Sequence, residues 1–251
     1  MKHLLFASAF LMTFLFQAQN TAIAPGEKLV YAASYNMSGV LNDIAQVTLE
    51  TSNVKTSKAT LLHLKCKAVT YTKWDNFFKI RDLYESYVTP KTLLPYLYKR
   101  DINEGGYFKN MKYTFNHKTN TVKSVQTKKN NWVEKKEIKI NSGTQDIVST
   151  LYKIRLLDYE SMKVGVKKTV SIIFDREEKK AQITYLGKES INTSIGNKTC
   201  YKLKLSSTES SALKGDVWLT ADNNKIMVYG KFKIPVGNGE LKIKSATGLM
   251  H

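Results

Sequence analysis

Apolar and polar residues alternate along most of this chain, which is the pattern of strands with one buried face. The stretch 29–37 alternates up to Gly39, and 40–50 returns with the same period, which predicts a hairpin. Turn residues such as Asp222-Asn223-Asn224 separate later stretches of the same kind. Further strands are predicted at 62–68, 80–88, 93–102, 107–117, 122–127, 132–140, 169–175, 181–186, 189–195, 200–206, 217–220, 225–234 and 240–245. The pattern therefore predicts an all-β protein with mostly antiparallel strands.

One segment departs from the two-residue period. Ile147, Leu151 and Ile154 recur at the spacing of one helix face, which predicts an amphipathic helix near 145–157. Thr144 is the expected cap, with Asp146 in an acidic first turn. The stretch 71–78 is expected to form a second, shorter helix or a turn. A long antiparallel meander with so little helix predicts an open half-barrel or a strongly curved sheet.

The first 18 residues have the pattern of a secretory signal peptide. Lys2 and His3 precede the apolar run 4–16, and Ala18 offers a small residue for cleavage. The run is short for a bilayer-spanning helix, which needs roughly 20 residues, although a retained N-terminal anchor is the alternative. We therefore expect an exported protein of the periplasm or outer envelope of a Gram-negative bacterium. Residues 19–251 are predicted to form a single β-rich domain, or a two-lobed one with a break near 158–168.

The formal net charge is +18, and many lysines fall in i, i+2 pairs that share one face of a strand. A solvated outer face that discourages pairing of sheet edges is one interpretation. Attraction to a lipid or another anionic envelope ligand, with peripheral contact to a membrane surface, is the other. Export and the lack of an arginine-rich or aromatic-basic motif argue against nucleic acid as the partner. The pairs are Lys65/Lys67, Lys202/Lys204, Lys231/Lys233 and Lys242/Lys244.

Signals for catalysis, metal binding and cofactors are weak. The sequence has no H-E-x-x-H, no G-x-S-x-G and no phosphate loop, and we expect neither a cofactor nor a metal. Cys66 and Cys200 each lie in a strand-like stretch, where cysteine usually acts as a small buried hydrophobe. An oxidising compartment would also permit a disulfide between them.

The stretch 80–102 supports a specific hairpin with Pro90-Lys91-Thr92 as its loop. In the predicted register, Asp82 lies opposite Arg100 and apolar residues meet apolar ones, whereas a one-residue shift would oppose like charges. Together with the run around Gly105-Gly106, this hairpin holds the densest set of polar residues in the chain. The candidate ligand-binding residues are Arg81, Asp82, Tyr84, Tyr96, Tyr98, Arg100, Asp101, Asn103 and Glu104.

Several stretches resemble a known family of bacterial envelope proteins. They are 26–31, 81–86, 94–96, 146–152, 229–237 and, most specifically, Arg100-Asp101-Ile102-Asn103-Glu104-Gly105-Gly106. The family is domain of unknown function 3108, common in Bacteroidetes, and the resemblance extends over 25–249. It implies an exported, mostly β protein with no assigned activity. In layout the chain is also similar to the open half-barrels of periplasmic lipoprotein carriers, which hold acyl chains in an apolar concavity.

Three functions are compatible with these observations. The first is non-catalytic binding of an apolar or amphiphilic, lipid-like envelope ligand, which predicts an apolar concavity beside Tyr84, Tyr96 and Tyr98. The second is a structural or assembly component that docks on envelope proteins, which predicts a solid core and an exposed apolar patch. The third is a carboxylate-dependent hydrolase, which requires two carboxylates facing a cleft. Against the third, the neighbouring arginines are expected to keep the carboxylates of this hairpin ionised.

Overall fold

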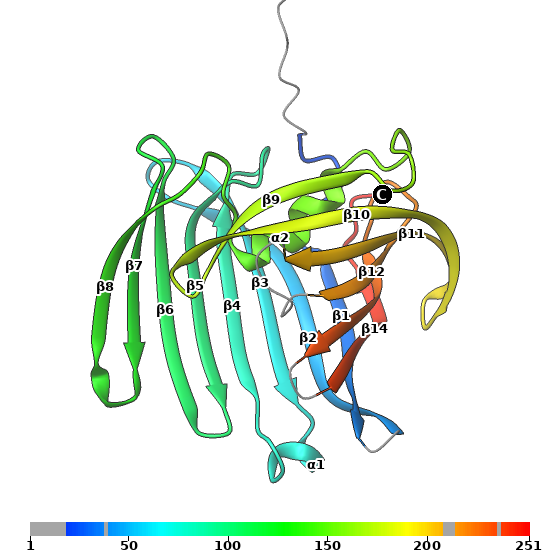
Figure 1. Ribbon diagram of the computed structural model, residues 1–251, viewed down its shortest axis with the longest axis horizontal. Coiled ribbons are helices and arrows are strands. Elements are labelled where there is room, and N and C mark those ends of the chain that lie inside the picture. Colours follow the sequence, from blue (N-terminus) through cyan, green and yellow to red (C-terminus); the bar gives the residue numbers. More distant parts are fainter. Residues whose placement is uncertain (1–18, 38–39, 208–213, 235–236) are drawn as a thin grey trace, which may run out of the picture.

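The computed structural model describes residues 19–37, 40–207, 214–234 and 237–251, so the predicted signal peptide lies outside the described residues. The chain forms one antiparallel sheet of 14 strands that is open rather than closed, with β8 and β9 at its two edges (Figure 1). This confirms the predicted fold class. The strands are β1 (Lys28–Met37), β2 (Val40–Lys55), β3 (Thr60–Thr70), β4 (Arg81–Val88), β5 (Pro95–Glu104), β6 (Tyr107–Asn116), β7 (Thr121–Lys128), β8 (Val133–Lys139), β9 (Lys167–Phe174), β10 (Glu177–Thr193), β11 (Gly196–Ser207), β12 (Lys214–Thr220), β13 (Met227–Ile234) and β14 (Gly237–Thr247).

The sheet consists of two meanders that share one hydrogen-bonded seam. Strands β1 to β8 pair in sequence order, as do β9 to β14, and β1 pairs with β14 to join the two sets. Alternation of burial along the strands gives each set one inner and one outer face. On β6, for example, Met111, Tyr113 and Phe115 are buried, while the residues between them are exposed.

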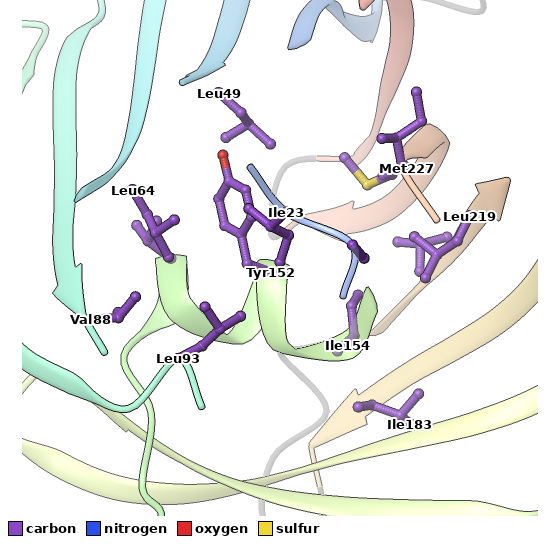
Figure 2. Close-up of a cluster of buried hydrophobic side chains, with 14 of the residues drawn as sticks. Ile23, Leu49, Leu64, Val88, Leu93, Tyr152, Ile154, Ile183, Leu219 and Met227 are labelled. Atoms are coloured by element: carbon purple, nitrogen blue, oxygen red, sulfur yellow. The ribbon is translucent and has the colours of Figure 1, made fainter. Parts of the chain in front are cut away.

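Helix α2 (Ile147–Lys153) lies on the concave side of the sheet and is followed by the 3-10 turn η2 (Ile154–Leu156). Tyr152 and Ile154 meet inner-face residues from both meanders (Figure 2). Burying a large apolar side chain contributes about 1.5–3 kcal/mol, so this contact holds the two halves of the sheet around the helix. The partners drawn there include Leu49, Leu64, Val88, Ile183, Leu219 and Met227.

The helix begins later than predicted, and Asp146 rather than Thr144 is its N-cap. The Asp146 side chain accepts a hydrogen bond from the Ser149 N–H at 2.8 Å, and Ser149 Oγ accepts one from the Asp146 N–H at 3.0 Å. This is a capping box. Gln145 cannot be helical because its backbone pairs with β9: its N–H donates to the Ser171 carbonyl and its carbonyl accepts from the Ile173 N–H. Thr144 Oγ1 instead donates to the Asn141 carbonyl at 2.8 Å.

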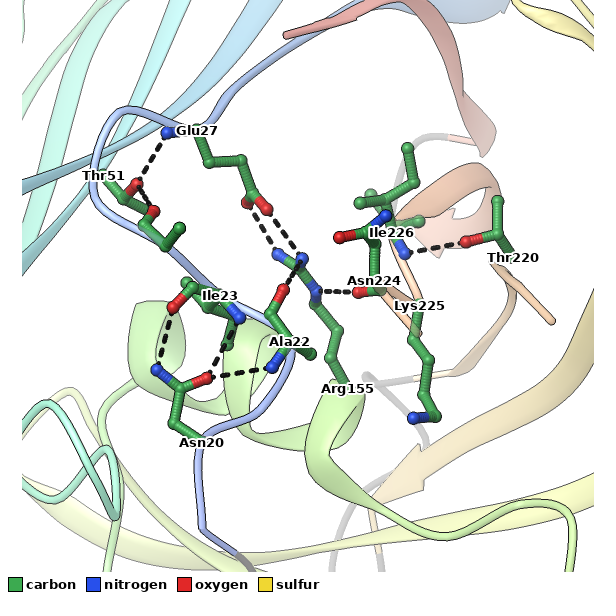
Figure 3. A network of polar contacts seen from close by, with 12 residues as sticks. Asn20, Ala22, Ile23, Glu27, Thr51, Arg155, Thr220, Asn224, Lys225 and Ile226 are labelled. Atoms are coloured by element: carbon green, nitrogen blue, oxygen red, sulfur yellow. Dashed lines mark hydrogen bonds and ion pairs between the residues drawn. The ribbon is translucent and has the colours of Figure 1, made fainter. Parts of the chain in front are cut away.

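A buried ion pair ties three distant segments together behind α2 (Figure 3). The two terminal nitrogens of Arg155 each donate to one carboxylate oxygen of Glu27 at 2.7 Å. The remaining donors reach the carbonyls of Ala22 and Asn224, both at 3.0 Å. The pair therefore joins the segment before β1, the end of α2 and the turn between β12 and β13.

Strand β10, the two cysteines and the helices each add a detail to the fold. Strand β10 is continuous where the sequence predicts two strands, because a bulge between Tyr185 and Gly187, with Gly187 at φ +109°, interrupts the alternation without ending the pairing. Cys66 and Cys200 are both free thiols. The short helix α1 (Thr72–Asp75) occupies the predicted 71–78 region. Within the described ranges, no helix has the length and hydrophobicity of a membrane span.

Candidate functional site

The β4–β5 hairpin, which carries the predicted site, pairs two residues away from the expected register. Tyr84 lies opposite Arg100 and Ser86 opposite Tyr98, so the prediction that Asp82 opposes Arg100 is wrong. The loop is longer than expected and runs from Thr89 to Leu94, because Leu93 turns inward at φ +55° and is fully buried. A shift of two residues keeps Asp82, Tyr84, Tyr98 and Arg100 on their predicted face, whereas Tyr96, beside the irregular pairing at Val88, is exposed.

The structure divides the nine candidate residues between the two faces. Asp82, Tyr84, Tyr98, Arg100 and Glu104 lie at alternate positions on the inner face, with Asp82, Tyr98 and Arg100 buried. The other four are not part of this inner cluster.

Each of those four residues has a separate environment. Arg81 binds Asp75 of α1, with 2.5 Å between Nη2 and Oδ2. Asp101 is exposed on the outer face, opposite Leu83 and Asn110. Tyr96 is exposed and lies with its ring edge against His117. Asn103 contributes its backbone to the inner cluster.

Asp82 and Glu104 form the centre of the inner cluster. Asp82 accepts hydrogen bonds from the Asn103 N–H at 3.0 Å and from the Tyr84 hydroxyl at 3.1 Å. Partial burial, a hydrogen bond with Asp82 and the negative charge of Asp82 raise the pKa of Glu104 to about 7, against the lowering effect of Arg100. Glu104 therefore keeps its proton at weakly acidic pH, contrary to the expectation that the arginines would hold the carboxyls of this hairpin ionised.

Arg100 is directed toward a partner that the sequence does not reveal. Its guanidinium forms an ion pair with Asp175, and its centre lies 4.7 Å from the ring centroid of Phe174. Lys109 Nζ lies 2.8 Å from the same Asp175 carboxylate. Burial opposes ionisation of Asp175, but hydrogen bonding to Lys109 and the charge of Arg100 lower its pKa.

Asp175 belongs to the turn of the β9–β10 hairpin, which comes from the other half of the molecule. Asp175 and Arg176 have φ angles of +47° and +67°, as a tight two-residue hairpin turn requires. The Arg176 N–H donates to the Tyr113 hydroxyl at 2.8 Å, and the Arg176 guanidinium binds Glu134 on β8 at 2.5 Å. The turn thus docks on the inner face of β5, β6 and β8.

This docking fills the space in which the sequence predicts an apolar concavity. Tyr98 is 1% exposed and stacks on the buried Tyr113 with 5.5 Å between ring centroids. The predicted concavity beside Tyr84, Tyr96 and Tyr98 is therefore wrong: its walls are packed or face outward. Tyr98 Oη, Arg100 Nε and Ser124 Oγ are buried without a hydrogen-bond partner among the described residues.

A hollow lies on the outer face of the sheet, across the ends of β11 to β14. It is a groove of about 440 Å³ that lies between the basic strand ends and the β1–β2 hairpin. Positive and negative residues alternate across four neighbouring strands. Lys204 lies opposite Asp216, Asp216 opposite Lys231, and Lys231 opposite Glu240. Three of the four predicted lysine pairs lie on these strands. The groove is lined by Asn36, Leu41, Lys204, Lys214, Gly215, Asp216, Lys231, Phe232, Lys233, Asn238, Gly239 and Glu240.

The lysines of the groove are unequally neutralised. Lys231 lies 3.8 Å from Glu240, which also binds Lys242 at 3.1 Å. Lys204, Lys214 and Lys233 make no ion pair with any residue that the structure describes. The groove therefore presents unbalanced positive charge beside the apolar side chain of Leu41.

Two glycines set the position of the Phe232 ring. A Cβ on Gly215 would lie 2.8 Å from the Phe232 ring and 2.6 Å from the Lys231 carbonyl oxygen. A Cβ on Gly230 would lie 2.7 Å from the same ring. Both positions therefore require glycine for the ring to lie against the strands. The sequence predicts the lysine faces but not this groove. The groove forms where β11 to β14 meet the β1–β2 hairpin, and only the pairing of β1 with β14 brings these strands together.

A group of three or more histidine, cysteine or acidic side chains that could hold a metal ion is not found in the described part of the chain. The family model for a protein of unknown function, DUF3108, matches residues 30–244. The chain belongs to the DUF3108 family. The resemblance carried by the stretches around 81–86 and 100–107 is thereby confirmed, and the family itself has no assigned function.

The fold of this family member has a solved counterpart. The β-barrel-like protein of domain of unknown function DUF1849 from Brucella abortus superimposes with a TM-score of 0.60 at 7% sequence identity, covering 89% of this chain and 97% of that chain. At such low identity the likeness shows the fold alone. A Bacteroides fragilis protein of YmcC-like fold aligns over 90% of this chain and 97% of its own at 8% identity, with a TM-score of only 0.31. No curated protein matches the sequence.

Proposed function

We propose that this protein is a non-catalytic binder of an amphiphilic, anionic, lipid-like ligand of the bacterial envelope, and that the groove on β11 to β14 is its binding site. One observation carries this proposal. Lys204, Lys214 and Lys233 have no ion pair among the described residues, and they surround a groove whose wall includes the apolar side chain of Leu41. Positive charge next to apolar surface suits a ligand with an acidic headgroup and a hydrocarbon part.

The proposed compartment rests on the sequence. The signal-peptide pattern of residues 1–18 supports export to the periplasm or outer envelope, where anionic amphiphiles are abundant. Export would also account for a high positive charge without a nucleic-acid partner.

The inner cluster supports catalysis less well. A hydrolase needs two carboxylates open to a cleft, but Asp82 is buried and its two oxygens accept hydrogen bonds from Asn103 and Tyr84. A docking component of the envelope is the second candidate, and the packed interior beside Tyr98 favours it.

Native mass spectrometry tests the proposal on protein purified from its own envelope fraction without detergent. We expect an added mass that is lost on denaturation and that short-chain phosphatidylglycerol, but not phosphatidylcholine, replaces. Lys204→Glu/Lys233→Glu should lose the adduct, because it reverses two groove charges without breaking an ion pair of the described residues. Lys67→Glu/Lys123→Glu is the matched control, since both lysines are exposed on strands outside the groove and change the net charge equally. A wild-type protein that carries and takes up no lipid would overturn the groove proposal and favour the docking component.

A further inference from the structure

Exposed apolar side chains gather at one end of the sheet. Because neighbouring strands are antiparallel, the connections β1–β2, β3–β4, β5–β6 and β7–β8 all lie at the same end, which is the lower rim in Figure 1. Six large apolar residues at these connections are exposed, and together they are called the tip rim: Val40, Phe77, Phe78, Tyr107, Phe108 and Trp132.

The tip rim is too exposed to be part of the fold's own core. Phe77 is 76% exposed and Trp132 is 64% exposed. Single exposed apolar residues are ordinary, but their concentration at four adjacent hairpin ends marks a surface that contacts something else. Their exposure therefore calls for an occupant outside the chain.

The hairpin ends that carry these side chains are held in place. Trp74 of α1 donates from its indole N–H to the Asp43 carbonyl on β2 at 2.9 Å, which links two of the connections. Phe78 packs against Gly105 in the β5–β6 turn, where an added Cβ would come within 2.9 Å of its ring. The Gly105 N–H also donates to the Lys79 carbonyl at 2.9 Å. These contacts tie β2 and the connections β3–β4 and β5–β6 together, so this part of the rim is a preformed surface and not a set of independent loops.

Positive charge accompanies the apolar tips. Lys73, Lys79 and Lys129 are exposed at the same connections and have no ion pair within the described ranges. The acids nearby are already engaged: Asp75 binds Arg81, and Glu134 binds Lys128 and Arg176. The rim therefore offers apolar contact and unbalanced positive charge together.

We propose that the tip rim is a membrane-docking surface, on which the apolar tips enter the interfacial region of an anionic bilayer and the lysines contact its phosphate headgroups. Tryptophan and tyrosine favour that region because one end of each ring is apolar and the other polar. Each lysine near an anionic bilayer adds electrostatic attraction to the headgroups. A protein partner fits less well, since lysine is depleted at protein–protein interfaces.

Docking by the rim orients the whole molecule. The strands would rise from the bilayer, with α2 away from it, nearer the opposite end of the sheet (Figure 1). Leu41, which lines the groove, lies next to Val40 of the rim, so the groove would open close to the membrane. Rim docking does not require the groove to bind lipid, and the two proposals fail independently.

Sedimentation with phospholipid vesicles tests the rim. We expect the wild-type protein to pellet with vesicles of phosphatidylethanolamine and phosphatidylglycerol, less with phosphatidylcholine alone, and less in high salt. Phe77→Ser/Trp132→Ser should lower the partition coefficient at least about tenfold, which corresponds to about 1.4 kcal/mol. Both side chains are exposed, so the variant should keep the wild-type melting temperature.

The matched control is Val164→Ser/Met250→Ser. These residues are also exposed, Val164 by 68%, but they lie outside the four hairpin connections of the rim. The control should sediment like the wild type. Lys204→Glu/Lys233→Glu should still sediment through its intact rim even when it has lost a lipid adduct.

Fluorescence provides a second readout. Tryptophan emission should shift to the blue when anionic vesicles are added, and Trp132→Phe should remove most of the shift, because Trp218 is buried and Trp74 is half-buried, whereas Trp132 is exposed. A wild-type protein that stays in the supernatant with anionic vesicles would overturn the proposal, even if the rim bound a protein. Equal losses in the rim variant and the control, or no loss in the rim variant, would overturn it as well.

Discussion

The buried Glu27–Arg155 pair gives a quantitative prediction about stability. In Arg155→Met the apolar stem is largely kept, but the Glu27 carboxylate loses both of its 2.7 Å bonds. The side chains of Arg155 and Glu27 are 3% and 0% exposed, so water cannot replace the lost partner without opening the structure. Removing one partner of a buried pair costs about 3–5 kcal/mol.

This loss is large enough to separate from ordinary surface effects. For a chain of this size, 1 kcal/mol corresponds to about 2–4 °C, so the melting temperature should fall by about 6–20 °C. The Lys28–Glu50 pair is a suitable comparison, because its side chains are 52% and 36% exposed. Lys28→Met should cost less than about 1 kcal/mol.

Urea unfolding followed by circular dichroism measures both variants and the double variant Glu27→Leu/Arg155→Met. The double variant should be more stable than Arg155→Met alone, because it contains no unpaired buried carboxylate. The reasoning is refuted when Arg155→Met costs less than about 1 kcal/mol, or when removing Glu27 as well gives no recovery.

Three other predictions concern the inner cluster and the groove. The pKa of Glu104 is raised from 4.5 to about 7 in the folded protein, so its contribution to stability is present below pH 4.5 and is lost as pH rises toward 7. The variant Glu104→Gln should lose less stability than the wild type between pH 4.5 and 7 in unfolding experiments. An equal loss of stability in the two proteins would contradict this prediction. Gly215→Ala should lower stability by about 1–3 kcal/mol in thermal unfolding, because the new Cβ overlaps the Lys231 carbonyl and the Phe232 ring. Arg100→Met should speed hydrogen exchange at the β9–β10 turn, where Asp175 loses its buried partner and keeps only Lys109, whereas the exposed Lys99→Met should not.

The strands could be predicted because the sheet has one buried and one exposed face. Met111, Tyr113 and Phe115 alternate with polar residues on β6, and this period is visible without any knowledge of partners. The start of α2 was not predictable in the same way. Gln145 has no local property that keeps it out of a helix, and it is extended only because β9 lies beside it.

The candidate site was predictable in its faces but not in its pairings. The alternation of side chains along a strand is enough to place Asp82, Arg100 and Glu104 on one side of the hairpin, whatever the register. The register depended on the loop, whose length is set by burial of Leu93 against distant residues. Asp175, the true partner of Arg100, lies 75 residues away in the sequence, and only the tertiary fold brings it close.

That long-range pair also determines where a ligand can bind. An open, curved sheet would leave its concave face free, and the aromatic residues of β4 to β6 would then form the wall of a cavity. Here Arg100 holds the β9–β10 turn against that face, and Tyr98 and Tyr113 pack together beneath it. The unneutralised lysines and the exposed apolar tips lie instead on the outer face and the rim. With the interior closed, the recognition that we propose falls to the outer surface and the rim, where positive charge and apolar side chains lie side by side.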